Sequence, residues 1–205
     1  MNLENPKKYQ LLVDQAHEVA VNFFRPISRK YDKAEHAYPK ELDMLASLLD
    51  GMNAGSAEGT SSTALGKRGA ADDGSIKNGA NMSAALGVIE LCYGDTAFLL
   101  TMPRQGLGNS AIGAVANEEQ LKRFHGMWAA MAITEPGTGS DSANIRTTAV
   151  KDGDDYILNG EKIFVTCGAR ADCVVVWATI DKSLGRAAIK SFVFELGTQG
   201  MEVAR

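Results

Sequence analysis

The chain has 205 residues, of which 45% are hydrophobic and 22% charged, and its formal net charge is −4. This composition is ordinary for a globular protein, and so mild a charge gives no reason to expect a nucleic-acid partner, which normally requires a clustered basic surface. No run approaches the roughly 18 apolar residues of a membrane span, and the first ten residues lack the apolar core of a signal peptide, so we expect a cytoplasmic protein with no membrane span.

The cysteines and histidines indicate no chemistry of their own. The cysteines are odd in number and include no closely spaced pair, which argues against a disulfide scaffold and a structural zinc site. No two histidines have a metal-ligand spacing, and none flanks a candidate nucleophile. We therefore predict no metal site and interpret these residues as structural or surface residues: Cys92, Cys167, Cys173, His17, His36 and His125.

Up to about residue 127 the periodicity is helical. Asn5 and Pro6 suit the start of a helix, and Pro26 is expected to kink or end it. Between them, apolar residues at helical spacing predict one buried face: Tyr9, Leu12, Val13, Ala16, Val19, Ala20 and Phe23. A second helix is expected from Pro39, with Leu42, Leu45, Leu48 and Leu49 facing inward and Gly51 as its C-terminal stop.

The segment 51–79 carries seven glycines and little that could pack. A loop of this length inside a compact domain is unusual and is either functional or mobile, and mobility is the preferred interpretation. Helical patterning resumes at 80–92 and at 95–102, where Asp95 can cap the helix. Residues 106–116 are small enough for close helix packing, and Asn117 begins a helix with an acidic first turn.

After residue 127 the pattern changes to short β-strands, expected at 128–134, 146–150, 156–158, 163–166, 173–179 and 191–195. Asp152-Gly153 is a turn signal, and Asn159-Gly160 is the strongest hairpin signal in the chain. The predicted fold class is α+β: an N-terminal all-α bundle (1–127) followed by an antiparallel β-barrel-like domain (128–205).

The segment Ala132–Asp141 (AITEPGTGSD) leaves a predicted strand and enters a loop with two glycines and a proline. Glycines let the backbone approach a ligand and adopt positive φ, and the hydroxyls of Thr138 and Ser140 could add donors, so the loop suits a phosphate or the polar edge of a flat ring. It lacks the Gly-Lys-Ser/Thr ending of a P-loop and the Gly-x-Gly-x-x-Gly of a Rossmann site. From these residues alone, a ligand loop and a plain connecting loop remain equally open.

Two segments in order, Ala132–Asp141 and Asn159–Thr166 (NGEKIFVT), resemble the signatures of the acyl-CoA dehydrogenase family. Thr138 stands where that family usually has a smaller residue, and Phe164 stands where it usually has tryptophan. A Gly-Ala-Arg-Ala stretch (168–171) follows, as a Gly-x-x-Ala stretch does in the family.

The resemblance implies that FAD is the cofactor. Thr134 would bond the pyrimidine end of the flavin, Phe164 would stack near the ring, and Thr166 would bond close to N5. Gly139 and Ser140 would face the pyrophosphate or the acyl-CoA. The implied flavin-binding residues are Met131, Ile133, Thr134, Gly139, Ser140, Phe164, Val165 and Thr166, with Ser140 also substrate-binding. The structural alternative makes Phe164 and Val165 core residues and Thr166 a surface hydroxyl. For Glu135 and Asp141 the resemblance implies structural roles.

The implied activity is α,β-dehydrogenation of an acyl-CoA in lipid metabolism, with an electron-transfer flavoprotein or similar acceptor and a homo- or hetero-oligomeric assembly. In this family the catalytic carboxylate usually lies in a C-terminal helical domain that has no counterpart here, so no catalytic residue is nominated. We expect the chain to be a fragment that is inactive alone. Two alternatives remain: a non-catalytic partner subunit with an unpaired strand edge at 190–197, and a flavin monooxygenase or oxidase of the same fold.

Overall fold

The computed structural model describes residues 7–35, 37–53, 79–103 and 107–204, which fall into two compact units, one made of the first three ranges and the other of 107–204. The predictions for Asn5, Pro6 and His36 and for most of the 51–79 segment lie outside the described residues, as do those for the side chains of Leu48 and Leu49. Among the described residues, no helix is long and apolar enough to cross a membrane.

The first unit begins with a 3-10 turn η1 (Lys7–Tyr9) and a long helix formed by α1 (Gln10–Val19), a π-helical segment η2 (Ala20–Phe24) and α2 (Arg25–Lys33). The helix does not end at Pro26 but continues to Lys33. In the π turn just before the proline, the Arg25 N–H donates to the Ala20 carbonyl, five residues back. This wider turn makes room for a ring that would otherwise clash with a carbonyl of the preceding turn.

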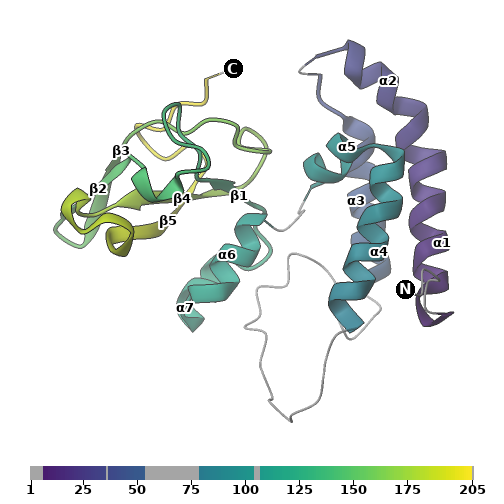
Figure 1. The fold of residues 1–205 in the computed structure, drawn as a ribbon, viewed down its shortest axis with the longest axis horizontal. Helices are drawn as coiled ribbons and strands as arrows, with labels where there is room; N and C mark the ends of the chain where they lie inside the picture. The colour runs from purple at the N-terminus through teal and green to yellow at the C-terminus, as the bar shows by residue number, and fades with distance from the viewer. Residues whose placement is uncertain (1–6, 36, 54–78, 104–106, 205) are drawn as a thin grey trace, which may run out of the picture. The chain divides into compact units, whose positions relative to one another are not determined.

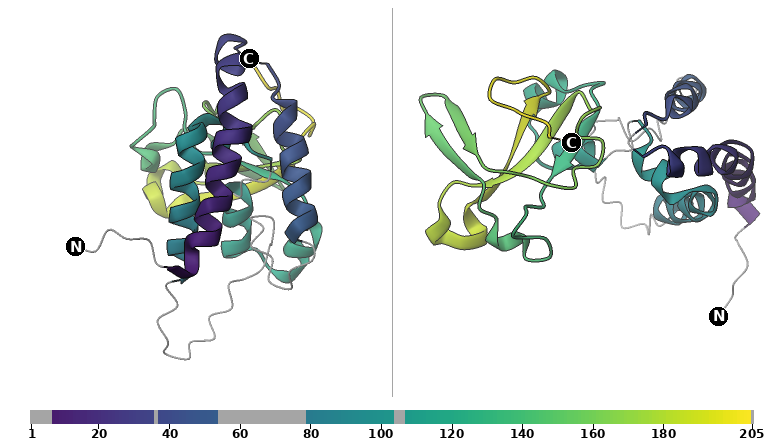
Figure 2. Two further views of the ribbon diagram at one scale, coloured as in Figure 1. Left: turned by 90° about the vertical axis from the view of Figure 1, so that its right-hand side faces the viewer. Right: turned by 90° about the horizontal axis from the view of Figure 1, so that it is seen from above.

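Three further helices complete the first unit: α3 (Lys40–Asn53), α4 (Gly79–Gly94) and α5 (Thr96–Thr101). In Figures 1 and 2, α1 and α4 lie side by side. The core contains Phe24, Leu42, Leu45 and Phe98, which confirms the inward direction of the two described leucines. Asp95 caps α5 by accepting from the Phe98 N–H at 3.0 Å, as predicted. Gly51 lies inside α3, so the expected stop there is wrong.

In the second unit, α6 (Leu107–Val115) packs on the sheet, and α7 (Glu118–Arg123) follows it. The predicted close packing of small residues is observed at Gly108, where an added Cβ would lie 2.4 Å from the Ala129 carbonyl oxygen. Asn117 begins α7 with a capping box, in which its side chain and that of Gln120 each accept a backbone N–H of the other residue. Contacts group both helices with the sheet. The predicted domain division at 127/128, which rests on periodicity, stays a prediction.

The sheet consists of β1 (Ala129–Ala132), β2 (Thr148–Asp152), β3 (Asp155–Asn159), β4 (Cys173–Thr179) and β5 (Ile189–Glu195). β4 is its centre, pairing with β1 in parallel, with β5 antiparallel and with β2 through the single parallel pair Thr148–Thr179. β2 and β3 form an antiparallel hairpin that reaches away from β4 (Figure 2). The predicted antiparallel barrel is therefore only partly right: the sheet is open and mixed, because the long connection from β1 to β4 lets the two run in the same direction.

Two local β predictions are wrong. The hairpin turn lies at Asp152–Asp155, where the weaker Asp152-Gly153 signal stands, and not at Asn159-Gly160, where β3 ends. Residues 163–166 do not form a strand, because Phe164 has a φ of 56° and so interrupts the extended backbone that a strand needs.

Both faces of β4 are covered, which explains its almost continuous apolar sequence, CVVVWAT. Cys173 and Val175 pack with Ile112, Phe124 and Ala129 on the face that carries α6 and α7. On the opposite face, β4 belongs to a second cluster, which also takes in the chain after β3. Its members are Trp128, Ala130, Ala132, Ala171, Val174 and Val176, with Leu158, Val165 and Cys167 packed beside them. The sheet thus holds the end of β1 and the segment 160–171 close to one rigid core.

Candidate flavin and acyl-CoA site

The loop after β1 is a tight turn. The Glu135 N–H donates to the Thr138 carbonyl at 3.0 Å, and the Thr138 N–H donates back to the Glu135 carbonyl at 3.1 Å, with Pro136 and Gly137 between them. Neither Gly137 nor Gly139 has a positive φ, so the expected left-handed glycines are not observed. At Gly139 the chain leaves open space, because an added Cβ would meet no atom of the described chain within 4 Å. The loop therefore presents an open backbone surface beyond its turn.

The Glu135 carboxylate is buried and collects donors from separate segments of the chain. It accepts the Arg146 N–H at 2.6 Å, the Thr147 N–H at 2.9 Å and the Thr147 hydroxyl at 2.5 Å. The Lys162 ammonium adds an ion pair at 2.8 Å. Burial raises the pKa of this carboxyl, but donation by Lys162, Thr147 and the two backbone N–H groups outweighs that effect and lowers the pKa to about 2. Glu135 is thus an ionised structural anchor, as the resemblance implied.

Lys162 links the two resembling segments directly. Its ammonium donates to the Glu135 carboxylate and also to the Ile133 carbonyl at 2.9 Å. Beside it, the Ile163 N–H donates to the Thr134 carbonyl at 2.9 Å. The end of β1 and the chain after β3 are therefore joined by one backbone hydrogen bond and one buried cation.

Gly160 explains why the second segment begins with Asn-Gly although no hairpin turn forms there. A Cβ at Gly160 would lie 2.4 Å from the Thr147 hydroxyl oxygen and 2.7 Å from the Thr147 Cα. Real Cβ atoms do not tolerate such contacts, so only glycine fits beside Thr147. Thr147 is the residue that sequence reasoning missed, since a threonine in a β-rich stretch carries no distinguishing signal.

Phe164 is the most unusual residue of the site. Its side chain is 88% exposed, the highest value among the large exposed hydrophobic residues, and its backbone has a φ of 56°. A bulky side chain in the left-handed region is an outlier, and such outliers gather at ligand sites. Phe164 is thus not the core residue of the structural alternative, whereas Val165, packed against the second core cluster, fits that alternative.

A hollow of about 530 Å³ opens beside the loop. Ile133, Ser140 and Asp141 line it together with Trp177 of β4, Ile189 of β5 and two 3-10 segments, η3 (Ser142–Asn144) and η4 (Lys182–Ala188). η4 contributes Arg186, the cation of the lining, which no sequence pattern distinguishes from an ordinary loop arginine.

The structure groups the predicted site residues in two places. Ile133 and Ser140 share the hollow, whereas residues 164–166 are not part of its lining. Met131, Thr134 and Thr166 are half-buried, and Gly139 is exposed. The connection between the two groups is the bonding of Lys162 and Ile163 to the end of β1.

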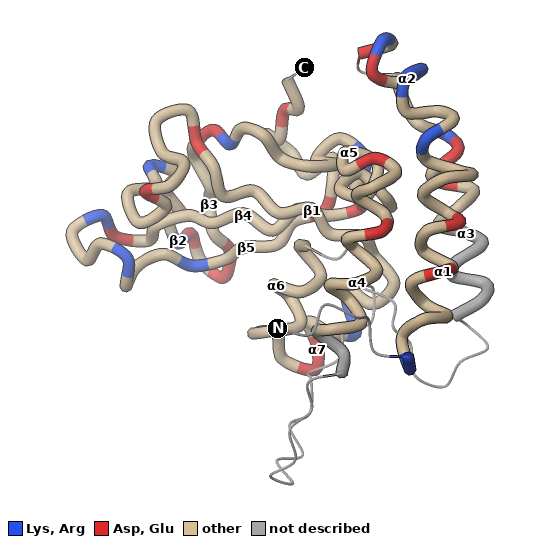
Figure 3. The backbone as a smooth tube through the Cα atoms, turned by 45° about the vertical axis from the view of Figure 1, so that its right-hand side comes forward, with Lys and Arg blue, Asp and Glu red and all other residues tan. Residues whose placement is uncertain are grey.

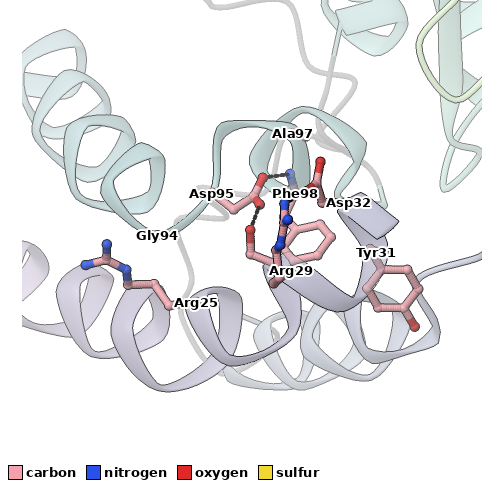
Figure 4. Close-up of a pocket in the computed structure, with 9 residues that line it drawn as sticks. Arg25, Arg29, Tyr31, Asp32, Gly94, Asp95, Ala97 and Phe98 are labelled. Carbon is pink, nitrogen blue, oxygen red and sulfur yellow. Dashed lines mark hydrogen bonds and ion pairs between the residues drawn. The ribbon is translucent and has the colours of Figure 1, made fainter. Parts of the chain in front are cut away.

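The first unit has a hollow of its own, of about 500 Å³, between α2 and the α4–α5 junction (Figure 4). Figure 3 shows basic and acidic residues mixed along α2. Arg29 pairs with Asp32 and Lys30 with Glu41, while Asp95 accepts from Ser28 and Phe98. This hollow contains none of the predicted site residues, and its lining is explained by the helix contacts alone.

Comparison with known proteins identifies the family. Residues 130–205 match the family model "Acyl-CoA dehydrogenase, middle domain". This range contains both resembling segments and every predicted site residue. Over residues 130–205 the chain therefore belongs to the acyl-CoA dehydrogenase family, as a match to its middle domain.

Individual relatives agree with this assignment. The chain is 44% identical over 91 residues to cyclohex-1-ene-1-carbonyl-CoA dehydrogenase of Geobacter metallireducens, covering 43% of this chain and 24% of that protein. It is 35% identical over 130 residues to an acyl-CoA dehydrogenase of Bacillus subtilis, covering 60% and 31%. Subunit CarC of the caffeyl-CoA reductase-Etf complex of Acetobacterium woodii is 42% identical over 76 residues, covering 37% and 20%.

Solved structures extend the likeness to the whole chain. Butyryl-CoA dehydrogenase from Megasphaera elsdenii matches with a TM-score of 0.71 at 28% identity, covering 98% of this chain and 51% of that one. PigA with FAD and proline matches with a TM-score of 0.74 over 100% of this chain and 52% of its own, but at 22% identity it shows the fold alone. The chain thus spans about half the length of these structures.

Proposed function

We propose that the chain is part of an FAD-dependent acyl-CoA dehydrogenase and supplies the side of the site that faces the flavin. The observation that carries the proposal is Phe164, an aromatic ring that is held out of the core on a left-handed backbone next to the end of β1. The match to the acyl-CoA dehydrogenase family supports a flavin ring as the partner of that aromatic surface.

The residues present fit FAD. The exposed Phe164 ring offers a flat apolar surface, and the backbone at Gly139 is open where a ligand would need to approach. Thr134 and Thr166, both half-buried, would bond the polar edge of the ring, while Met131 and Ile133 would shape the apolar side and Val165 would hold the chain beside Phe164 against the core. When bound, FAD would accept the hydride taken from the acyl group; the protein supplies the binding, orientation and electrostatics.

The acyl-CoA would lie toward the hollow beside Ser140. The Ser140 hydroxyl offers a donor, and the Arg186 guanidinium in the same lining suits a phosphate. Glu135 is not the proton-abstracting base, because its buried carboxylate is occupied by donors from two other segments, Arg146–Thr147 and Lys162. The base therefore belongs to a part of the enzyme outside the site described above, and we expect the 205-residue chain to bind FAD weakly without turning over an acyl-CoA.

Titration of the chain with FAD, followed by flavin fluorescence and absorbance, tests this function. We expect saturable binding that Phe164→Ala weakens at least about tenfold, which corresponds to 1.4 kcal/mol. Ile157→Ala, at another exposed apolar position of the same unit, should leave the affinity unchanged. No binding by the parent chain, or equal loss in both variants, would contradict the proposal. Tightly bound flavin that is bleached by an acyl-CoA would contradict the expected inactivity of the chain.

CarC, by its name, belongs to a complex with Etf, which supports an electron-transfer flavoprotein as the acceptor for this dehydrogenase.

A second candidate, a non-catalytic partner subunit, is favoured by the sheet edge at β5, which pairs only with β4 among the described strands. Size-exclusion chromatography of the chain with and without a complete homologue distinguishes this partner subunit from the dehydrogenase. Stable co-elution would favour the partner role and a monodisperse monomer would count against it.

A further inference from the structure

The buried contact between Lys162 and Glu135 does more than join two charges. Glu135 accepts from the Arg146 and Thr147 backbone before β2 and from Lys162 after β3. Lys162 in turn donates to the Ile133 carbonyl at the end of β1. Three segments that are separate in sequence therefore meet at one ion pair.

The segment that carries Phe164 has little else to hold it at this end. Residues 160–165 belong to no helix or strand, and Phe164 itself contributes almost no burial. Its left-handed backbone requires the surroundings to fix it, because an isolated phenylalanine avoids that conformation. After Phe164, the Val165 side chain packs against the second core cluster; before it, the contacts that can do so are the Lys162 ammonium and the Ile163 N–H, which both bind the end of β1.

We propose that Lys162 and Glu135 are positioning residues that hold Phe164 and its neighbours in register with the end of β1, so that the two flavin-facing segments form one rigid surface. The expected effect on FAD binding rests on the proposed function. The expected effect on the pairing of Ile163 with the end of β1 does not depend on any ligand. Neither residue needs to touch the cofactor, and both act through the backbone that they fix.

Geometry makes this role specific to the ammonium of Lys162. Glu135 keeps the Arg146 N–H, the Thr147 N–H and the Thr147 hydroxyl as donors, so removing the lysine leaves the carboxylate bonded but removes the link to Ile133. Arginine carries the same charge and several donors, so Lys162→Arg should keep both links. Methionine has a similar length with neither charge nor donor.

Hydrogen exchange of the ligand-free chain tests the register. In Lys162→Met we expect the Ile163 amide, bonded to the Thr134 carbonyl, to lose at least about tenfold of its protection, while the Val175 amide in β4 does not change. Lys162→Arg should restore the protection. Arg123→Met is the matched control, because it removes the exposed ion pair with Glu195 in the same unit.

FAD titration tests the consequence. Lys162→Met should raise the dissociation constant of FAD at least about tenfold and shift the visible circular dichroism of the bound flavin, and Lys162→Arg should return both toward the parent values. If Lys162→Met does not fold, Glu135→Gln/Lys162→Met takes its place. In that double variant the glutamine oxygen can still accept the Thr147 N–H, and no buried charge is left alone.

Unchanged protection at Ile163 in a folded variant that lacks the ammonium would overturn the positioning role. So would parent-like FAD affinity and spectrum in that variant, given a parent chain that binds FAD. If the parent chain binds no FAD at all, the proposed function fails, and exchange at Ile163 still decides the structural role of the ion pair.

Discussion

The two units each contain a Lys–Glu ion pair of nearly the same length, and the two pairs differ in almost everything else. Lys30 and Glu41 lie 2.7 Å apart in the first unit, with side chains 59% and 31% exposed. Lys162 and Glu135 lie 2.8 Å apart in the second, with side chains 9% and 4% exposed. The pKa of the glutamate is lowered to about 2 in both pairs.

The causes of the two shifts are different. The pKa of Glu41 is lowered first by donation from Lys30 and then by the Tyr31 hydroxyl, in water-exposed surroundings. At Glu135, burial by itself raises the pKa, and Lys162, Thr147 and two backbone N–H groups must overcome that effect. Equal distance and equal pKa therefore do not mean equal importance, because solvent can replace the partner of Glu41 but not that of Glu135.

The largest predicted difference is in stability. Glu135→Leu takes the carboxylate from two backbone N–H groups and from the buried Lys162 ammonium, which keeps the Ile133 carbonyl, so we expect the free energy of unfolding of the second unit to fall by about 3–5 kcal/mol. The fluorescence of Trp128 and Trp177, the two tryptophans of the chain, reports on this unit during urea unfolding.

Glu41→Leu is the matched control in the first unit, followed by helical circular dichroism. We expect a much smaller fall in its unfolding midpoint than Glu135→Leu causes in the second unit, because both side chains of that pair remain hydrated. Equal destabilisation by the two substitutions would show that burial does not separate the pairs.

The next largest effect is a difference in stability between alanine substitutions at two glycines of the site. Gly160→Ala forces a Cβ into Thr147 and should destabilise the second unit by about 1–3 kcal/mol. Gly139→Ala meets no atom of the described chain, so its unfolding midpoint should match the parent while FAD affinity falls. A stable Gly160→Ala variant would show that Thr147 moves aside easily.

Phe164 should give a smaller effect of opposite sign. Phe164→Gly removes a side chain that is almost unburied and relieves a left-handed backbone, so we expect stabilisation of about 0.5–1 kcal/mol together with weaker FAD binding. Phe164→Ala keeps the backbone strain and should leave stability unchanged. Chemical unfolding of both variants separates strain from ring contact, and a loss of stability in Phe164→Gly would mean that the ring packs on the chain.

The smallest effect is the response to salt during acid titration. Because the folded pKa of Glu135 and of Glu41 is about 2, against an ordinary value of 4.5, each contributes stability above pH 4.5 that is lost as the pH falls through about 2. We expect about 0.5 M NaCl to abolish the difference between parent and Glu41→Gln, but not that between parent and Glu135→Gln. Equal screening of both would contradict the burial argument.

Helix positions were the easiest part of this fold to predict. Asp95 and Asn117 have side chains whose local chemistry decides where a helix begins, and both cap as expected. Gly51 shows the limit of such rules, because α3 continues through it. Pro26 shows another, since a π turn that no local signal indicates absorbs the proline.

The sheet was harder because its pairing depends on distant segments. Alternation places strands but does not state whether two of them run in parallel, and β1 and β4 do so across a long connection. The Asn159-Gly160 pair gave a wrong hairpin prediction for a related reason: the glycine is required by Thr147, thirteen positions upstream, and not by a turn. The family resemblance indicated the candidate site segments. The role of Thr147 and the position of Arg186 in the hollow depend on how distant segments fold together, so the sequence did not indicate them.

The π turn at Ala20–Phe24 sets the rotational phase of the first helix. Each residue turns an α-helix by about 100°, so a turn that holds one extra residue rotates everything after it by that amount. Phe24 and Tyr31 meet the Phe98 ring edge-on, both with centroids 5.7 Å away, in this phase. Deleting one residue between 20 and 24 would therefore shorten the helix very little but turn Tyr31 away from Phe98. A change in length at this point would thus rotate the side chains of α2 about the helix axis.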